Sequence, residues 1–369
     1  MKSVIRNIGR FKVQATQDYT IIELEKMWLG IQQQTDPPFF LSWAWISCWV
    51  KTYHPAIIVV TASVDSTLVS IGLFTESIEY RHGFISSKQL RLHQTGDLKM
   101  DQIWMEYNDF LCLSEFKADA VNASLQALGE IKTWDEIIIS MMQENRARQL
   151  YIPKSCISTD LVTPGFSVDL SELATSGKPY IESLSPNTRY QIRKSIRLYE
   201  QTYGELVLQH ATTTAEALEL FHEAGNFHIQ RWQDSGYLNQ DFLNFHENLI
   251  RNGFDQGQIH LIKAKAGNET IAILYFHLIN QSVYFYLHGL RYEPNRKLKP
   301  GLVAHALATQ FYLDEGMKTY DYMGGFSQYK KQLSRPSGNM CTVCIQRPRI
   351  RFRVENLART IKKKLFRDH

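Results

Sequence analysis

The spacing of apolar residues divides the first half of the chain into short helices and strands. Ile21, Leu24, Trp28 and Ile31 recur every three to four positions, which predicts a helix over residues 20–34 with one buried face. Short β-branched and aromatic runs between polar turns predict strands. Strands are expected at residues 10–16, 56–62, 68–78, 89–93, 104–113 and 136–141, and further helices at 41–53 and 114–132.

The second half repeats this order of elements. Apolar runs at residues 258–265, 270–279 and 282–290 are joined by hairpin-sized turns, which predicts three consecutive antiparallel strands. A helix is expected at 301–315, ended by Gly316. The other expected elements are strands at 205–210, 319–323 and 340–346 and helices at 186–203, 214–233, 239–253 and 328–333.

Each half therefore runs strand, two helices, three antiparallel strands, helix, strand. This order predicts an α/β (α+β) protein with two tandem domains, each a mixed, mostly antiparallel sheet flanked by helices. Residues 158–178 are rich in Ser, Thr, Gly and Pro and mark the boundary. The expected division is an N-terminal domain (1–165), a linker and basic helix (166–203), a C-terminal domain (204–346) and a basic tail (347–369).

Composition and charge agree with a folded chain whose basic residues gather at one end. Of the 369 residues, 44% are apolar and 21% are charged, which excludes a largely disordered protein. Residues 346–369 hold nine Lys/Arg and two Asp/Glu, 9 − 2 = +7, so the other residues carry 4 − 7 = −3. The body is thus not a basic DNA-binding surface. The tail either forms a basic amphipathic helix that contacts anionic lipid or packs on the body.

The cysteines and histidines give no sign of a disulfide framework or a metal site. The five cysteines are odd in number and scattered, which is typical of a reducing compartment. Cys341 and Cys344 form a lone CxxC, only half a zinc site. No apolar run reaches the roughly 18 residues of a membrane span, and residues 1–13 lack a signal-peptide apolar region. We expect a cytoplasmic protein without a metal, whose tail is its candidate for peripheral membrane contact.

A basic loop before the helix at residue 300 carries the clearest candidate chemistry. Pro300 and Gly301 open this helix. Free backbone N–H groups and the helix dipole make such a start an anion site, and flanking cations strengthen it. The same residues also suit an ordinary helix start, where proline is common. The residues expected to hold a pyrophosphate are Arg296, Lys297, Lys299, Gly301 and Leu302.

Several short motifs, in this order, resemble those of a known superfamily. They are Trp28-Leu29, Pro38-Phe39-Phe40, Trp43, Trp45, Tyr107-Asn108-Asp109, the basic helix from Arg189 to Arg197, Pro300-Gly301-Leu302, Asp314-Glu315-Gly316, Tyr320-Asp321-Tyr322, Gly325 and Tyr329-Lys330. With the order of elements, they resemble the GNAT acyltransferases, and among these the Fem-like, cellulose-biosynthesis-type acetyltransferase family. The resemblance covers about residues 10–345, and the order and spacing of the motifs carry it.

The resemblance implies a donor and a place for it. In this fold the helix after the fourth strand holds the pyrophosphate of coenzyme A, and the fourth and fifth strands splay around the acyl group. Acetyl-CoA or another acyl-CoA is therefore the implied co-substrate. The usual phosphate loop, Q/R-x-x-G-x-G/A, is kept at Arg296 and Gly301, but Lys299 replaces its middle glycine. Fem-type relatives use aminoacyl-tRNA instead, so the choice of donor stays open.

Direct acyl transfer needs a positioned nucleophile, a base and donors for the developing oxyanion. His288, at the end of the fourth strand, and Asp321, on the fifth, are the candidate bases. The Tyr329 hydroxyl can protonate a leaving thiolate, and Lys330 can bind a phosphate or the tetrahedral intermediate. Each residue also has a structural explanation, as a strand cap, a backbone partner or part of a solvated helix face.

The acceptor is expected to be a small molecule or a glycan or cell-envelope precursor, a context that comes from the resemblance alone. Arg189, Arg193 and Arg197 share one helix face that suits an anionic acceptor, although such a face can simply be solvated. Glu106 and Asp109 are candidates to contact it from the first half. The chain is thus predicted to be an N- or O-acyltransferase. The alternatives are a peptidyltransferase that uses aminoacyl-tRNA and a non-catalytic scaffold of an envelope-polysaccharide system.

Overall fold

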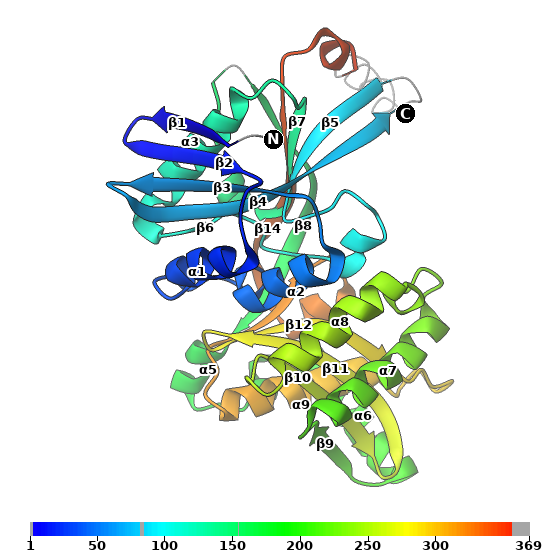
Figure 1. Ribbon diagram of the computed structural model, residues 1–369. Coiled ribbons are helices and arrows are strands. Elements are labelled where there is room, and N and C mark those ends of the chain that lie inside the picture. Colours follow the sequence, from blue (N-terminus) through cyan, green and yellow to red (C-terminus); the bar gives the residue numbers. More distant parts are fainter. Residues whose placement is uncertain (1–2, 82–84, 154, 356–369) are drawn as a thin grey trace. The chain divides into compact units, whose positions relative to one another are not determined.

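The computed structural model describes residues 3–81, 85–153 and 155–355 and divides into two compact units (Figure 1). Unit 1 comprises Met1–Trp43, Tyr53–Val162 and Met340–His369, and unit 2 comprises Ala44–Thr52 and Thr163–Asn339. The chain passes from unit 1 into unit 2 within β8 (Cys156–Asp169) and returns within β14 (Arg335–Gln346). Neither unit is therefore one continuous stretch of sequence.

Unit 1 is built on a mixed sheet in the order β1-β2-β3-β4-β5-β7-β14, with β6 paired to β4. Neighbouring strands from β1 to β14 pair antiparallel except for β5 with β7, which is parallel. Phe11, Val13 and Ala15 of β2 are buried while Lys12 is exposed, so that strand buries one face. The strands are β1 (Val4–Ile8), β2 (Phe11–Thr16), β3 (Ile57–Val64), β4 (Thr67–Arg81), β5 (Ile85–Leu92), β6 (Leu111–Cys112) and β7 (Glu136–Gln143).

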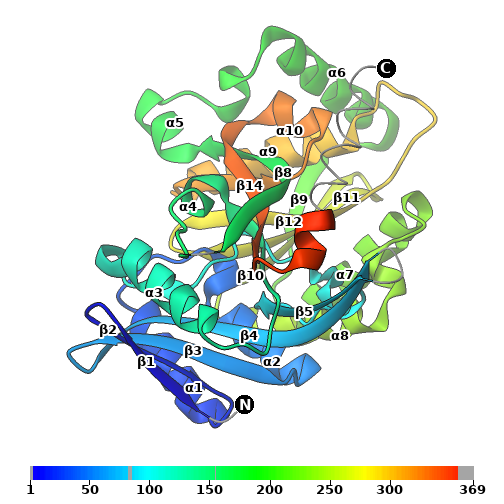
Figure 2. The same cartoon turned by 90° about the horizontal axis from the view of Figure 1, so that it is seen from above.

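Helices α1 (Ile21–Gln32), α3 (Lys117–Gly129) and α4 (Glu144–Ala147) accompany this sheet. Thr20 and Glu23 form a reciprocal capping box at the start of α1. The predicted apolar face of α1 is confirmed, since Leu24, Trp28 and Ile31 are buried. Helix α3 packs across β1, β2 and β3, as Figure 2 shows.

Unit 2 is built on a second section of the strand order, β8-β13-β12-β11-β10-β9, within one continuous sheet. Its pairs are antiparallel except for β12 with β13. The hairpin turns predicted between three consecutive strands are present at β10–β11 and β11–β12. The strands are β9 (Leu206–His210), β10 (Ile259–Ala266), β11 (Glu269–Ile279), β12 (Ser282–Leu290) and β13 (Thr319–Gly324).

Helices cover both faces of this second section. Helices α7 and α8 pack on one face, in front of β10–β12 in Figure 1, and α6 and α9 pack on the other. Helix α2 contributes its central residues, Ala44–Thr52, to this unit. The helices are α2 (Trp43–Tyr53), α5 (Leu170–Ser176), α6 (Pro186–Tyr203), α7 (Thr214–Arg231), α8 (Gln240–Gly253), α9 (Pro300–Asp314) and α10 (Gln328–Leu333).

The mixed, mostly antiparallel strands flanked by helices in both units confirm the predicted fold class, but three local expectations were wrong. The expected strand 104–113 shortens to β6, because Trp104 and Tyr107 adopt positive φ angles of 44° and 53° that an extended strand does not allow. The boundary between the units falls within 158–178, yet that stretch forms β8 and α5 rather than a loop. The last strand, expected in the second domain, pairs with β7 in unit 1.

Candidate active site

Strands β12 and β13 are paired only where they begin. Their parallel register joins Ser282–Tyr284 to Thr319–Asp321. Within the described residues that pairing goes no further, although β12 continues to Leu290 and β13 to Gly324. The outer half of β13 stays paired with β8. The two strands therefore diverge toward their carboxyl ends, as expected of a sheet that admits an acyl group there.

A β-bulge in β12 sets the direction of His288. Consecutive residues of β11 pair with Leu287 and with Phe285, so Tyr286 is an extra residue on β12. Side chains alternate between the faces of a strand, and one extra residue shifts that alternation. His288 consequently lies on the α9 face together with Phe285, and the two ring centroids are 5.3 Å apart.

His288 contacts α9 and α10. Its Nδ1 lies 3.4 Å from Nε2 of His305 on α9, and its ring centroid lies 5.7 Å from that of Tyr329 on α10. Burial, together with nearby His228 and Lys330, lowers the pKa of His288 to about 3. The imidazole is therefore neutral at pH 7 and has a lone pair with which to accept a proton.

Tyr329 places its phenol ring beside this imidazole. Its ring stacks on His305 with centroids 5.5 Å apart and an interplanar angle of 13°. Burial raises the pKa of Tyr329 well above its usual value. The hydroxyl therefore keeps its proton at neutral pH and can donate it to a developing negative charge.

A cavity of about 460 Å³ lies beside His288 and Tyr329 and reaches the start of α9. Lys299 is the N-cap residue, and within the described part of the chain no side chain caps this helix. The Lys299 N–H donates to Ser195 Oγ at 2.8 Å. The first N–H groups of a helix have no partner inside it, so those at Gly301 suit an anion. The residues lining this end are Arg296, Lys299, Pro300, Gly301 and Leu302, with Gln191 and Tyr292 beside them.

The structure thus brings six of the expected residues to one cavity: His288, Tyr329, Arg296, Lys299, Gly301 and Leu302. The residues lining it do not include Lys297 or Lys330. Lys297 is exposed, and Lys330 is buried and donates from Nζ to the carbonyl of Gly324. The cations of Arg296 and Lys299 and the uncapped start of α9 fit a pyrophosphate. Lys299, the N-cap residue, lines the cavity.

Asp321 has a backbone partner. Its Oδ1 accepts from the N–H of Met323 at 2.6 Å. That contact holds an irregularity in β13, where the register with β8 shifts and Met323 has a φ of 62°. Tyr320 and Tyr322 both contact His305 on the α9 face, so Asp321, between them, points to the other face. The residues lining the cavity do not include Asp321.

The basic face of α6 is partly neutralised by one glutamate. Arg189 lies 3.2 Å from Glu182 Oε2, and Arg193 pairs with the other oxygen of the same carboxylate. Arg197 is exposed and donates to the carbonyl of Arg193. The helix begins at Ser185, whose hydroxyl accepts from the third residue of the first turn.

The candidates in unit 1 are held by their own surroundings. Asp109 Oδ2 lies 3.0 Å from Arg146 Nε and 3.7 Å from Lys117 Nζ. Its neighbour Asn108 bonds His93 and the carbonyl of Leu92. Glu106 is also buried. The Tyr-Asn-Asp motif therefore fixes the loop that replaces the expected strand.

Sequence reasoning missed His305 and Ser195. His305 lies fully buried on α9 and connects His288 to Tyr320, whose hydroxyl is 2.8 Å from His305 Nδ1. A polar ring one turn after Gly301, in an otherwise apolar helix, is the signal that could have identified it. Ser195 lies on α6 and binds the N-cap of α9 across a separation of 104 residues, which no local pattern reveals.

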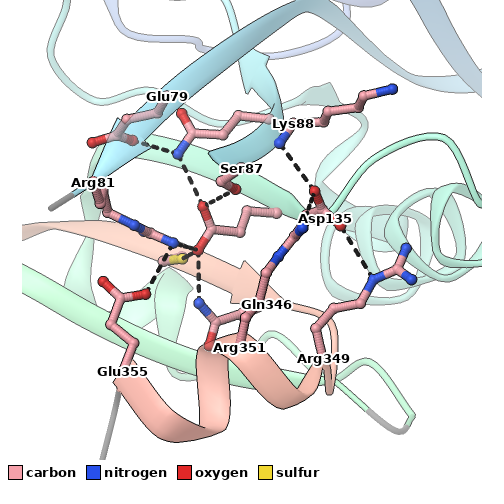
Figure 3. A network of polar contacts seen from close by, with 12 residues as sticks. Glu79, Arg81, Ser87, Lys88, Asp135, Gln346, Arg349, Arg351 and Glu355 are labelled. Carbon is pink, nitrogen blue, oxygen red and sulfur yellow. Dashed lines mark hydrogen bonds and ion pairs between the residues drawn. The ribbon is translucent and has the colours of Figure 1, made fainter. Parts of the chain in front are cut away.

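The described part of the basic tail is docked on unit 1 (Figure 3). Arg349 lies 3.2 Å from Asp135 Oδ1, and Arg351 lies 2.5 Å from its Oδ2. Arg347 donates to the carbonyl of Gly129 and stacks over a tryptophan ring. The expectation for residues 356–369 lies outside the described residues. For 347–355 the packed form, not a free lipid-binding helix, is present.

A buried carboxylate, that of Glu136, binds Arg81, Ser87 and Gln346, which Figure 3 labels. The Glu136 side chain has no exposed surface and accepts from Ser87 at 2.5 Å, Gln346 at 2.7 Å and Gln89 at 3.0 Å. Arg81 lies 3.0 Å away and also pairs with Glu355 of the tail. Burial alone would raise the pKa of Glu136, but these hydrogen bonds and the guanidinium outweigh it and lower the pKa. The network joins β4, β5, β7 and β14.

The described residues include neither a metal-binding cluster nor a membrane-spanning helix. Among residues 3–81, 85–153 and 155–355, no group of three His, Cys, Asp or Glu side chains is arranged to hold a metal ion. Over the same described residues, no helix combines the length and apolar character needed to cross a bilayer.

Comparison with known families places the cavity in a recognised domain. Residues 186–331 match the family described as "Acetyltransferase (GNAT) domain". This range includes α6, α9, β13 and nearly all of α10, and with them every residue that lines the cavity apart from Gln332. Residues 186–331 of unit 2 are therefore similar to a GNAT acetyltransferase domain, which supports a transferase. No curated protein matches the chain.

Solved structures share the fold at low sequence identity. "Crystal structure of FemX" has 11% identity and a TM-score of 0.58, with 87% of this chain and 95% of that chain covered. A conserved protein of unknown function from Bacteroides thetaiotaomicron has 12% identity and a TM-score of 0.52, with 89% and 98% covered. "The structure of L-PGS from Bacillus licheniformis" has 8% identity and a TM-score of 0.52, with 88% and 92% covered.

Proposed function

We propose that unit 2 transfers an acyl group, acetyl first among the candidates, from coenzyme A to an amine or hydroxyl of a small-molecule or glycan acceptor. The observation that carries this proposal is the cavity where an uncapped, cation-flanked helix start adjoins His288 and Tyr329. The match to a GNAT domain over the same residues supports a transferase. The cell-envelope context of the acceptor rests on the family resemblance of the sequence.

In this proposal the donor lies along α9 and the strand opening. The pyrophosphate receives hydrogen bonds from the N–H groups at Gly301 and Leu302, and Arg296 and Lys299 balance its charge. The acyl end enters the opening between β12 and β13. Lys299 stands where the usual phosphate loop has a glycine, and it adds a positive charge there. Because salt screens the attraction between this charge and the pyrophosphate, we expect donor binding to weaken as ionic strength rises.

The transfer itself is a direct attack. The acceptor N–H or O–H gives its proton to the neutral His288 as its lone pair forms a bond to the thioester carbonyl carbon. The C–S bond then breaks, and the leaving thiolate takes a proton from the Tyr329 hydroxyl. His288 then returns its proton to the Tyr329 oxygen, directly or through a water molecule, and both side chains regain their starting state. Asp321 remains a proposed acceptor-positioning residue on the other face of β13.

The acceptor is proposed to carry negative charge or many hydroxyls. Arg197 on α6 is exposed and, unlike Arg189 and Arg193, has no ion pair with Glu182. Arg189 and Arg193 would have to release the Glu182 carboxylate in order to bind an acceptor phosphate. A phosphate can accept the same pair of parallel hydrogen bonds from a guanidinium as a carboxylate does. Roles for Glu106 and Asp109 in binding the acceptor remain proposals.

Thermal shift with coenzyme A and acetyl-CoA tests the donor. A ligand present at 100 times its Kd stabilises the fold by about 2.7 kcal/mol, which gives a measurable rise in melting temperature. Lys299→Gln should reduce that shift, whereas Lys318→Gln, an exposed lysine just beyond the opposite end of α9, should not. If neither nucleotide shifts the melting curve, the acyl-CoA proposal is wrong. Salt-sensitive binding of aminoacyl-tRNA would then favour the peptidyltransferase, and no binding of either would favour the scaffold.

A further inference from the structure

A second cavity of unit 2 adjoins the donor cavity along α10. It measures about 580 Å³, within the range of about 300–1,000 Å³ that is common for small-molecule sites. Residues of β8, α5, the start of α6 and α10 line it, and these elements can be followed in Figure 2. Gln328 and Gln332 line both cavities and lie four positions apart, on one face of α10. A molecule in the second cavity can therefore reach the donor cavity across the helix that carries Tyr329.

The second cavity is lined by equal numbers of acidic and basic side chains. The acids are Asp169 and Glu172, and the bases are Lys331 and Arg335. Asp169 accepts from the N–H of Glu172 at 2.9 Å, and the Glu172 carboxylate lies 3.4 Å from Arg335. The Lys331 ammonium lies 4.0 Å from the centre of the Phe326 ring. A ligand of either charge would thus meet as many like as opposite charges in this cavity.

The helix starts at the two cavities also differ. Helix α9 opens the donor cavity without a side-chain cap among the described residues, so its free N–H groups suit an anion. At the second cavity, the Ser185 hydroxyl caps α6 and accepts from the N–H of Thr188 at 3.3 Å. Pro186, in the first turn of α6, has no N–H. Anion binding is therefore favoured at the donor cavity and not at the second one.

Uncharged groups supply the hydrogen bonds that the second cavity can offer. Within the described part of the chain, the side-chain amides of Asn187, Gln328 and Gln332 have no hydrogen-bond partner. An amide has two donor hydrogens and an acceptor oxygen, so it suits hydroxyl groups, which both donate and accept. Tyr180 and Leu333 form an apolar wall, since both are buried and the tyrosine hydroxyl donates to the carbonyl of Leu333. A sugar ring, with hydroxyls at its edge and C–H groups on its faces, fits this mixture.

We propose that the second cavity binds an uncharged carbohydrate and presents one of its hydroxyls across Gln328 and Gln332 to His288. Its role as the acceptor site rests on the proposed function, but ligand binding there does not. In the transfer, the hydroxyl oxygen forms a bond to the acyl carbon and its proton goes to His288. The C–S bond breaks, and the products are an ester and the free thiol of coenzyme A, whose proton comes from Tyr329. Of the two acceptor types, negatively charged or rich in hydroxyls, this cavity selects the second.

Carbohydrate binding can be measured without any donor. The probes are three neutral trisaccharides (maltotriose, cellotriose and triacetylchitotriose) and three ligands of other types (glucose 1-phosphate, protonated glucosamine and trialanine). Titrations followed by saturation-transfer NMR give the Kd of each. We expect a neutral trisaccharide to bind more tightly than all three other ligands. The proposal is overturned if no trisaccharide binds, or if a charged ligand or the peptide binds more tightly. Carbohydrate binding without any melting shift from acetyl-CoA would keep the site and reject the transferase.

Two variants locate the bound carbohydrate. Asn187→Leu removes an amide that lines the second cavity but not the donor cavity. The Kd of the trisaccharide should therefore rise about three- to tenfold, while the melting shift from acetyl-CoA is retained. Gln201→Leu is the matched control, because Gln201 is an exposed amide near the end of the same helix and lines neither cavity. An equal Kd in Asn187→Leu and the native chain would place the carbohydrate elsewhere and refute the proposal.

The acceptor role is tested with both ligands present. Interligand NOEs should connect the bound trisaccharide to the pantetheine arm of coenzyme A, since Gln328 and Gln332 line both cavities. Turnover should add the acyl group as an ester, which mild alkali hydrolyses, whereas an amide survives that treatment. Asn187→Leu should raise KM for the carbohydrate about three- to tenfold, with little change in kcat or in KM for acetyl-CoA. Absent NOEs or an alkali-stable added acyl group would refute the acceptor role and leave the proposed acyltransferase standing.

Discussion

Replacing Glu136 by glutamine tests the buried network that ties the tail to unit 1. Five donors reach this carboxylate, among them the Arg81 guanidinium at 3.0 Å and the Cys344 thiol at 3.8 Å, and the Glu136 side chain has no exposed surface. Glutamine has nearly the same size as glutamate. Its NH2 group, however, replaces one carboxylate oxygen and would face the donors that bind that oxygen in the native chain. Hydrogen bonds to charged groups contribute about 1.5–3 kcal/mol each, and removing one partner of a buried pair costs about 3–5 kcal/mol. Arg81 keeps Glu355 at 3.2 Å, so we expect the lower end, a loss of about 3 kcal/mol.

Native-state hydrogen exchange measures this loss where it should occur. Peptides from β5 and β7 report the opening free energy of unit 1 by itself, which matters because a chain with two units need not unfold in one step. The matched control is Glu79→Gln: Glu79 accepts from the same Gln89, but its side chain is 44% exposed, so its loss should be below about 1 kcal/mol. Equal losses in the two variants would refute the account of the network.

The pH dependence of the free energy of unfolding tests whether the charge of Glu136 stabilises the fold. The pKa of Glu136 is lower in the folded chain than its ordinary value. Its contribution is therefore fully present above the unfolded pKa of about 4.3 and is lost as the pH falls through the folded pKa. The native chain and Glu136→Gln should differ most near pH 7 and converge in acid. A difference that stays constant from pH 7 to pH 3 would show that the charge contributes nothing.

Three further perturbations follow from individual contacts. Tyr329→Phe should lower kcat by about 10²-fold with the melting shift from acetyl-CoA retained, and loss of the shift instead would make Tyr329 a binding residue. Gly289→Ala should destabilise unit 2 by about 2 kcal/mol or more, because a Cβ there would lie 2.4 Å from the carbonyl oxygen of Ala224; urea unfolding measures this, and an unchanged midpoint contradicts it. Asp135→Asn should release the described tail segment, seen as faster hydrogen exchange or proteolysis there, whereas unchanged protection would mean that its two arginines are not needed.

The elements of unit 2 were predictable because local patterns fix them. The alternating runs of β10, β11 and β12 and the proline at the start of α9 depend on neighbours within a few residues. The boundaries of the units were harder, because β14 pairs with β7 across some 200 positions of sequence. No periodicity records which distant strand will be the partner.

The candidate site divides in the same way. His288 and the start of α9 were recognisable from residue type and position. The direction of His288 was not, because it depends on one unpaired residue in β12, and a bulge has no strict sequence signature. Asp321 looked equally suitable as a base, yet its backbone partner follows from the positive φ two residues later. Sequence indicates which chemical groups are near a site, but register decides which of them face it.

The interleaved make-up of the two units has a consequence for biosynthesis. Residues Ala44–Thr52 leave the ribosome early but belong with a sheet that is complete only after residue 324. Trp45, Ile46 and Trp49, all within this segment, are almost fully buried in the finished protein, so the nascent chain must carry them uncovered. At about 5–20 residues per second that interval lasts many seconds. Unit 1 waits even longer, since its strand β14 is synthesised only after residue 334. Slow translation or a scarcity of chaperones should therefore reduce the yield of this protein more than that of a chain whose domains mature one after the other.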